Sequence, residues 1–360
     1  MSAPAVGGYA AWLAAQDAGR NAIEAAAPDE HLRAEGEAYL TRLAAYVIQR
    51  SLPAPSIGPP GLDYVGYLFA SANPDYRMGQ MTLDPAGRYR VEGRTGGADR
   101  IGFGIYTPTE QAGLQLDGYA TAADFAPDTD GRFAFTLARQ LDGRAGIVLG
   151  AGSRVLFVRE LYRRSGQGKA AIAITREDAP PPASPAEWDR AATDARFAGA
   201  AAQLAALLGQ FLRWSAIFAE QPNRMTPLSP ELDSAVRGDP NTLYYSGYYD
   251  LTGDEYLEIT IPAVTCDYWM IQANNHWLEP IAHRNDATAI PDGDGAVRIR
   301  VAPEPGASAN WLCTGGRLKG TLFYRTVGAD RAAVPQVRVR CVSGPSFRGV
   351  HGGLRFPQDT

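Results

Sequence analysis

Short segments with alternating apolar and polar residues, each followed by a turn motif, recur through most of this chain. In the first half they occupy residues 80–83, 88–93, 100–106, 132–137, 154–160 and 170–175. The motifs Asp84-Pro-Ala-Gly87 and Asp128-Thr-Asp-Gly131 lie between such segments and favour tight turns. A period of two is typical of antiparallel strands with one solvated face. The pattern therefore predicts antiparallel sheets arranged as a sandwich or jelly roll.

Further segments of this kind follow in the second half of the chain. They span residues 243–249, 256–261, 268–274, 296–301, 320–325 and 336–341. The chain contains 39 glycines and 26 prolines, a composition that favours many short elements joined by turns. We detect no internal repeat of fixed period among these segments.

Helical periodicity occurs in two parts of the chain. Residues 8–50 carry apolar side chains at helical spacing, and a break at Ala27-Pro28-Asp29 divides them into two predicted helices. A longer helix is predicted over residues 185–220, where a broad apolar stripe indicates packing against a sheet. Proline-rich loops at residues 52–61 and 179–185 precede the strands and the long helix, respectively.

These patterns predict an α+β protein, mainly β, with antiparallel jelly-roll or β-sandwich halves. An N-terminal helical segment covers residues 1–60, and a first β-rich domain covers 61–180. A linking helix at 181–225 leads to a second β-rich domain at 226–345 and a tail at 346–360.

Charge and composition exclude several classes of partner. The formal net charge is −5 and the basic residues are scattered, so neither nucleic acid nor an anionic membrane is an expected partner. No run of 18 apolar residues and no signal-peptide pattern occurs, so we expect no membrane span and a cytoplasmic location. Cys266, Cys313 and Cys341 lie far apart without a C-x-x-C pair, which indicates reduced thiols and disfavours a structural zinc site.

The run from Asp267 to Arg284 concentrates titratable and aromatic side chains after a predicted buried strand at 264–274. His276, Glu279 and His283 are the candidate catalytic residues, because a carboxyl and an imidazole within reach of one substrate can exchange protons. Their spacing of three and then four places them on one face if the turn is helical. The same residues could bind a divalent metal ion, or simply satisfy backbone groups at the strand exit. We predict no metal and no cofactor.

Aromatic side chains in the same region favour a binding pocket for a small molecule. The candidate substrate-binding residues are Trp269, Asn275, Trp277, Arg284, Trp311 and Tyr248. Aromatic rings with polar tips suit partly apolar, hydroxylated molecules such as terpenoids, steroids or sugars. A purely structural role for these rings is an equally acceptable interpretation.

Several motifs in this region, taken as a set, resemble the family called domain of unknown function 1214. The motifs are Tyr268-Trp269, Asn275-His-Trp-Leu-Glu279, Pro291-Asp-Gly-Asp-Gly295, Asn310-Trp-Leu312 and Gly320-Thr-Leu-Phe-Tyr-Arg325. In the first half, Asn73-Pro-Asp-Tyr76 and Val158-Arg-Glu160 resemble the first half of longer members. The resemblance covers most of residues 64–340. It implies a β-rich fold with jelly-roll-like sheets and flanking helices, and it implies no particular reaction.

The chain departs from the pattern of that family at two places. Pro280 and then Asn285 stand where many relatives have a serine and a basic, histidine-rich turn. Cys313 follows Asn310-Trp-Leu312 where relatives have an acidic residue. If these positions carry chemistry in the family, the chemistry of this chain differs.

Three functional hypotheses follow. The leading one is a cofactor-independent enzyme, a lyase, isomerase or hydrolase, in which Glu279 and His276 exchange protons and His283 or Arg284 orients the substrate. The alternative is a carbohydrate- or ligand-binding protein without chemistry, with an open aromatic face. The third is a structural partner in a homo-oligomer, which predicts an exposed apolar patch.

Overall fold

The computed structural model describes residues 7–27, 29–52, 61–67, 69–109, 113–178, 189–236, 238–306, 308–329 and 335–341. Within these ranges the chain forms four α-helices: α1 (Gly8–Ala26), α2 (Glu30–Ser51), α3 (Arg190–Ala219) and α4 (Pro230–Val236). The predicted loops at 52–61 and 179–185 and the tail at 346–360 lie largely or wholly outside the described residues. The long helix begins at Arg190, after its capping residue Asp189, whose carboxylate accepts a hydrogen bond from the Ala192 amide at 2.6 Å.

The first nine strands form two sheets, which we call the N-terminal β-unit. Its strands are β1 (Asp63–Tyr64), β2 (Tyr76–Thr82), β3 (Tyr89–Arg94), β4 (Arg100–Pro108), β5 (Leu114–Thr121), β6 (Arg132–Ala138), β7 (Gly146–Val148), β8 (Val155–Leu161) and β9 (Ala171–Arg176). One sheet has the order β1-β2-β8-β4-β5 and the other β7-β6-β3-β9. Side chains from both sheets, among them Val91, Phe103, Phe135 and Val158, form one apolar core. A short 3-10 helix, η1 (Ala122–Phe125), lies between β5 and β6.

The last nine strands form the C-terminal β-unit. They are β10 (Arg224–Pro227), β11 (Thr242–Asp250), β12 (Glu255–Ile261), β13 (Tyr268–Asn274), β14 (Pro280–Asn285), β15 (Val297–Ala302), β16 (Trp311–Cys313), β17 (Lys319–Val327) and β18 (Gln336–Cys341). The orders are β10-β11-β17-β13-β14 and β16-β15-β12-β18. The core between these sheets includes Ile259, Ile271, Ile299 and Tyr324.

The two β-units have the same strand order, strand for strand, in both of their sheets. Each unit contains one parallel pair, β6–β7 and β15–β16 respectively, whereas every other pair of described strands is antiparallel. The chain therefore contains an internal structural duplication, which the search for a repeat in the sequence did not detect.

A turn motif supports the duplication at the level of residues. Pro127-Asp-Thr-Asp-Gly131 precedes β6, and Pro291-Asp-Gly-Asp-Gly295 precedes β15. In each turn the glycine amide donates to the carbonyl of the first aspartate at 2.9 Å. Both Gly131 and Gly295 have a positive φ, 73° and 78°, which glycine adopts without steric cost. The two turns are thus the same structure with related sequences.

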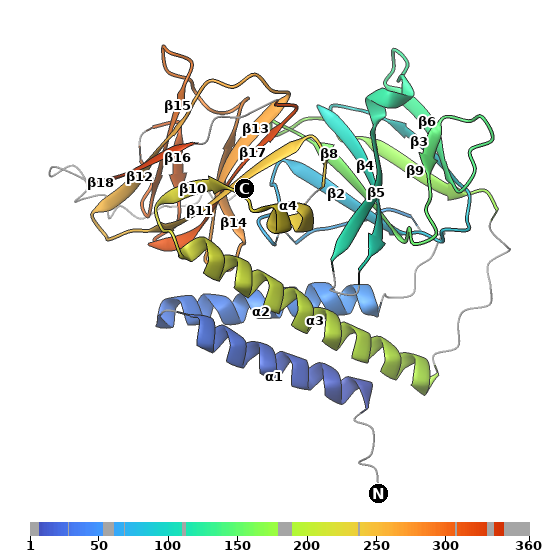
Figure 1. Cartoon of the computed structure of the whole chain (residues 1–360), viewed down its shortest axis with the longest axis horizontal. Coiled ribbons are helices and arrows are strands. Elements are labelled where there is room, and N and C mark those ends of the chain that lie inside the picture. Colours follow the sequence, from blue (N-terminus) through green and yellow to red (C-terminus); the bar gives the residue numbers. More distant parts are fainter. Residues whose placement is uncertain are drawn as a thin grey trace, which may run out of the picture.

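Helices α1, α2 and α3 pack side by side along one face of the molecule, below both β-units in the view of Figure 1. Their buried faces share a core with Tyr248, Trp277, Leu278 and Phe323 of the C-terminal β-unit. A small apolar cluster of Leu161, Tyr268, Met270 and Val327 connects the two units. These contacts hold both units against one helical layer.

The prediction of an α+β protein that is mainly β is confirmed: four sheets and a few helices make up the described chain. Jelly-roll connectivity and the predicted domain boundaries remain predictions. None of the helices in the described ranges is long and apolar enough to cross a membrane.

Candidate functional site

The sequence suggests that the chain leaves the sheet after β13. In the structure it instead turns back within five residues and continues as β14. The Asn275 side-chain oxygen accepts hydrogen bonds from the amides of Trp277 and Glu279, at 3.1 and 2.8 Å. Leu278 has a positive φ of 64°, which helps to close the turn. Strand β14 then runs antiparallel to β13, with His283 opposite Gln272. Because this segment is a hairpin and not a helix, the spacing of His276, Glu279 and His283 does not place them on one face.

His276 lies in the core between the helices and the C-terminal β-unit. Its side chain is buried, and its Nδ1 atom is 2.7 Å from the Tyr248 hydroxyl. Its backbone carbonyl accepts a hydrogen bond from Ser215 Oγ at 2.6 Å. Burial lowers the pKa of His276 to about 4, so the imidazole is neutral at physiological pH. This environment supports a structural role for both His276 and Tyr248.

Glu279 faces a depression of about 640 Å³ between the hairpin and α2. Its two carboxylate oxygens accept hydrogen bonds from Arg42 Nε and Nη2, both at 2.7 Å. Tyr67 donates to it at 2.6 Å and Asn275 Nδ2 at 2.7 Å. The hydrogen bond with Glu279 raises the pKa of Arg42, which strengthens the charged pair. A carboxylate with four donors is held in an ion pair that fixes the hairpin to α2.

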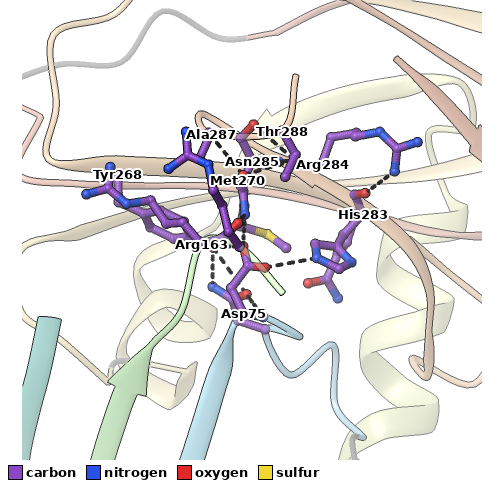
Figure 2. Close-up of polar contacts among 12 residues, drawn as sticks. Asp75, Arg163, Tyr268, Met270, His283, Arg284, Asn285, Ala287 and Thr288 are labelled. Carbon is purple, nitrogen blue, oxygen red and sulfur yellow. Dashed lines mark hydrogen bonds and ion pairs between the residues drawn. The ribbon is translucent and has the colours of Figure 1, made fainter. Parts of the chain in front are cut away.

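His283 forms a different pair, with a residue from the other β-unit (Figure 2). Its Nε2 atom lies 2.9 Å from Oδ1 of Asp75, and the two residues are 208 positions apart in the sequence. The Asp75 side chain is only 5% exposed, whereas that of His283 is 35% exposed. The other oxygen of Asp75 accepts hydrogen bonds from the Tyr268 hydroxyl at 2.6 Å and from Asn285 Nδ2 at 2.8 Å. Asp75 is thus a buried acceptor that holds a partly exposed imidazole.

Hydrogen bonds within the turn before β2 and to the end of β8 hold Asp75 in place. The side-chain oxygen of Asn73 accepts a hydrogen bond from the Asp75 amide at 3.0 Å, a common arrangement in turns that contain asparagine. The Asp75 carbonyl accepts from the amide of Tyr162 at 2.8 Å, just after the end of β8. Pro74 lies between the two acceptors, and its ring restricts φ. The carboxylate is therefore rigidly placed.

The groove beside His283 has a volume of about 430 Å³ and a strongly basic lining. Its cationic side chains are Arg77, Arg163, Arg164, Lys169 and Arg284, while Asp75 is its one carboxylate among the described residues. We call it the basic groove. Arg164 and Lys169 are exposed, and neither forms an ion pair with a described carboxylate. An anionic molecule would find uncompensated positive charge here, although the chain as a whole is acidic.

Two of the basic side chains are held in place by neighbours. Arg163 Nη1 donates to Asp286 Oδ2 at 2.8 Å, and Arg284 donates from Nε to the Ala309 carbonyl at 2.8 Å. Arg284 also donates from Nη1 to the carbonyl of His283 at 2.8 Å (Figure 2). Of the predicted site residues, the structure brings together His283 and Arg284 in this groove.

The three predicted tryptophans lie in three different places. Trp269 packs in the core of the C-terminal β-unit beside Tyr324. Trp277 stacks on Tyr39 of α2 and donates from Nε1 to the Leu32 carbonyl at 3.1 Å. Trp311 stacks on Tyr256 in the other sheet. The structure therefore does not form the predicted aromatic pocket from these residues, because each indole is part of a separate packing cluster.

Sequence reasoning missed Asp75 and the cations that the N-terminal β-unit contributes to the groove. Asp75 belongs to the motif Asn73-Pro-Asp-Tyr76, which is part of the family resemblance, so the sequence does contain a signal for it. Among the described side chains, no group of three His, Cys, Asp or Glu is arranged so that it could hold a metal ion. Cys266 and Cys313 are free thiols.

Part of the chain matches the model of a protein family. Residues 218–312 match a family model described as "Protein of unknown function (DUF1254)". This match supports the expected similarity to a family of unknown function. The resemblance to domain of unknown function 1214 in particular remains a prediction. Among curated proteins, none matches the chain.

Several solved structures match this chain, among them one from Burkholderia cenocepacia and one from Vibrio parahaemolyticus. An uncharacterized protein from Burkholderia cenocepacia has 28% identity and a TM-score of 0.86, with 93% of this chain and 97% of that chain covered. The VPA0106 protein from Vibrio parahaemolyticus has 12% identity and a TM-score of 0.49, with 91% and 100% covered. The similarity to the Burkholderia protein extends over both β-units and the helices.

Proposed function

We propose that this protein is a cofactor-independent enzyme in which His283 acts as a general acid–base on a small anionic molecule bound in the basic groove. The observation that carries the proposal is the pair of His283 and buried Asp75, placed at a groove with five cationic side chains. Acid–base chemistry remains the leading hypothesis, with His283 in place of His276 and Glu279 as the residue that transfers the proton.

The pairing of His283 with Asp75 suits proton transfer to and from a substrate. A carboxylate can only accept, so the bond to Asp75 favours the tautomer of His283 with the proton on Nε2. The lone pair on Nδ1 is then available to take a proton from a hydroxyl group, a water molecule or an acidic C–H. Asp75 stabilises the resulting imidazolium, as buried carboxylates do for catalytic histidines. Such chemistry serves a lyase, an isomerase or a hydrolase.

The cations of the groove would bind and orient the substrate. Lys169 sits 3.8 Å from the centre of the Tyr162 ring, which limits the positions of its ammonium group. Arg77 is bonded to Glu160 at 3.2 Å and still lines the groove. A phosphate or carboxylate group on the substrate would pair with Lys169 and Arg164, which have no carboxylate partner among the described residues, and an uncharged sugar or steroid would not.

The test is a turnover screen with a matched pair of histidine variants. Purified protein is incubated with phosphate monoesters, sulfate monoesters, hydroxycarboxylates and β-keto acids, and products are followed by NMR. For a substrate that is converted, His283→Gln should lower kcat by about 100-fold or more with little change in Tm. His31→Gln, which changes an exposed histidine on α2, should leave kcat unchanged.

Equal turnover by His283→Gln and the wild type would contradict this proposal. The alternative, a ligand-binding protein without chemistry, predicts that anions bind to the wild type and to His283→Gln while no member of the panel is converted.

A further inference from the structure

A further cavity, of about 310 Å³, lies where the two β-units meet the helices. We call it the interior cavity. Its walls carry several aromatic side chains, among them Phe157, Phe211, Trp214, Tyr244 and Phe323. Among the described residues it shares only Tyr76 with the basic groove, so it is a separate site. Its volume is at the lower end of the range for small-molecule pockets.

Each β-unit contributes one arginine to this cavity, and the two arginines lie at equivalent positions of the duplicated fold. Arg159 on β8 pairs with Met78 and Gly102, and Arg325 on β17 pairs with Tyr244 and Met270. In all four cases the partner is the third residue of the flanking strand, so the two arginines are equivalent. Both line the interior cavity.

Arg325 is a buried cation whose partners are all neutral. Its side chain donates from Nη1 to Gln272 Oε1 at 2.6 Å and from Nη2 to the carbonyl of Ser71. The residue is 8% exposed, and no carboxylate of the described chain lies within ion-pair distance of its guanidinium. A charge in such surroundings is costly unless a counter-charge is present.

Arg159 is partly buried, and its hydrogen-bond partner is also neutral. Its guanidinium donates to the hydroxyl of Tyr106 at 3.0 Å and lies 5.2 Å from the centre of the Phe157 ring. It too forms no ion pair with a carboxylate in the part of the chain that the structure describes.

Asp239 is the one acidic side chain on the cavity wall among the described residues, and it is already engaged. Asp239 Oδ2 accepts from Arg100 Nη2 at 2.9 Å and from the Tyr119 hydroxyl at 2.8 Å. Arg100 also lies 3.9 Å from Asp267, and neither of these carboxylates is within ion-pair distance of Arg159 or Arg325. The interior cavity therefore combines apolar walls with two arginines that have no carboxylate within ion-pair distance among the described side chains.

We propose that the interior cavity binds a small carboxylic acid with an apolar body, whose carboxylate interacts with Arg325 and Arg159 and whose body packs against the aromatic walls. Planar guanidinium groups match carboxylates through paired hydrogen bonds. The aromatic and aliphatic side chains on the walls favour a monoanionic acid with a hydrophobic body over a phosphate, which needs more donors. This site is independent of the acid–base chemistry proposed for His283.

The test is isothermal titration calorimetry with decanoate and 2-naphthoate as probes. Decanol and 2-naphthalenemethanol serve as uncharged counterparts, and inorganic phosphate serves as an anion without an apolar body. We expect at least one carboxylate to bind with a stoichiometry of one, and its alcohol and phosphate to bind at least tenfold more weakly. Arg325→Gln should weaken binding of that acid by about tenfold or more, because a charge-assisted contact is lost.

Further variants keep the test decisive if Arg325→Gln does not fold. Arg159→Gln should also weaken binding, and Leu207→Trp, which enlarges a side chain on the cavity wall, should prevent it. Arg139→Gln changes an exposed arginine outside the cavity and should bind the acid as the wild type does. The proposal is overturned if neither carboxylate binds, if the alcohols bind equally well, or if Leu207→Trp retains full affinity. His283→Gln should not change the affinity, which separates this outcome from that of the turnover screen.

Discussion

Arg159 of β8 and Arg325 of β17 occupy equivalent positions in two β-units of identical strand order and line the same interior cavity. Phe157 and Phe323, each two residues earlier on the same strands, line it as well. The cavity is thus a product of the duplication: each unit supplies one of the two arginines. Its location between the units and against α3 explains why neither half of the sequence points to it.

The buried imidazole of His276 predicts a pH-dependent stability. Its pKa is lowered from 6.5 to about 4 in the folded protein, so between these values the unfolded chain binds a proton that the folded chain does not. The folded state is therefore stabilised above pH 6.5 and loses this stability as the pH falls toward 4. At pH 5 the loss is about 2 kcal/mol in the free energy of unfolding.

Urea unfolding of the wild type and His276→Gln at pH 7.5 and pH 5.0 measures this effect. The variant is expected to be less stable than the wild type at pH 7.5, with a smaller difference at pH 5.0. A difference that does not change with pH would show that His276 does not cause the loss.

Glu279 is expected to contribute to stability and not to turnover. Glu279→Gln leaves Arg42 and Tyr67 with a neutral acceptor and should lower the free energy of unfolding by about 1 kcal/mol, since Arg42 is 45% exposed and solvent screens the pair. Arg42→Gln should cost a similar amount, and the double variant little more than either single one. Loss of turnover in Glu279→Gln without any loss of stability would restore this residue as a catalytic candidate.

Gly36 allows α2 to approach Trp277 closely. A Cβ atom at residue 36 would lie 2.5 Å from Ile23 Cγ2 and 2.6 Å from Trp277 Cζ2, so Gly36→Ala should destabilise the protein by about 1–3 kcal/mol. Gly199→Ala is the matched control on α3, where an added Cβ meets no atom within 4 Å. That variant should gain about 0.5–1 kcal/mol from helix propensity. Thermal unfolding should show a lower Tm for Gly36→Ala and a higher Tm for Gly199→Ala than for the wild type.

Asp75 is expected to determine the tautomer of His283. Asp75→Asn retains one acceptor oxygen for three donors, Tyr268, Asn285 and His283, and should lower the free energy of unfolding by about 1–3 kcal/mol. Nitrogen NMR of the imidazole should show the proton on Nε2 in the wild type and a mixture of tautomers in the variant. Asp142→Asn, which changes an exposed carboxylate, should leave both the spectrum and the stability unchanged. An unaltered His283 spectrum in Asp75→Asn would mean that the carboxylate does not hold the ring.

The local features of this chain were predictable from its sequence because neighbouring residues cause them. Alternation of apolar and polar residues marks the two faces of a strand, and the apolar spacing before residue 50 marks the buried face of α2. Prolines and glycines mark the turns. The α+β class and the predominance of strands follow from these patterns alone.

Only the tertiary structure decided which side chains share a site. Asp75 and His283 come from different β-units, and Arg42 meets Glu279 across 237 residues of sequence. Packing of two sheets on one helical layer creates these contacts, and no local pattern encodes a contact between distant segments. The sequence by itself therefore determined the elements and drew attention to residues 267–284. The folded arrangement determined that His276 is buried, that Glu279 is paired, and that His283 and the two cavity arginines face space that a ligand can occupy.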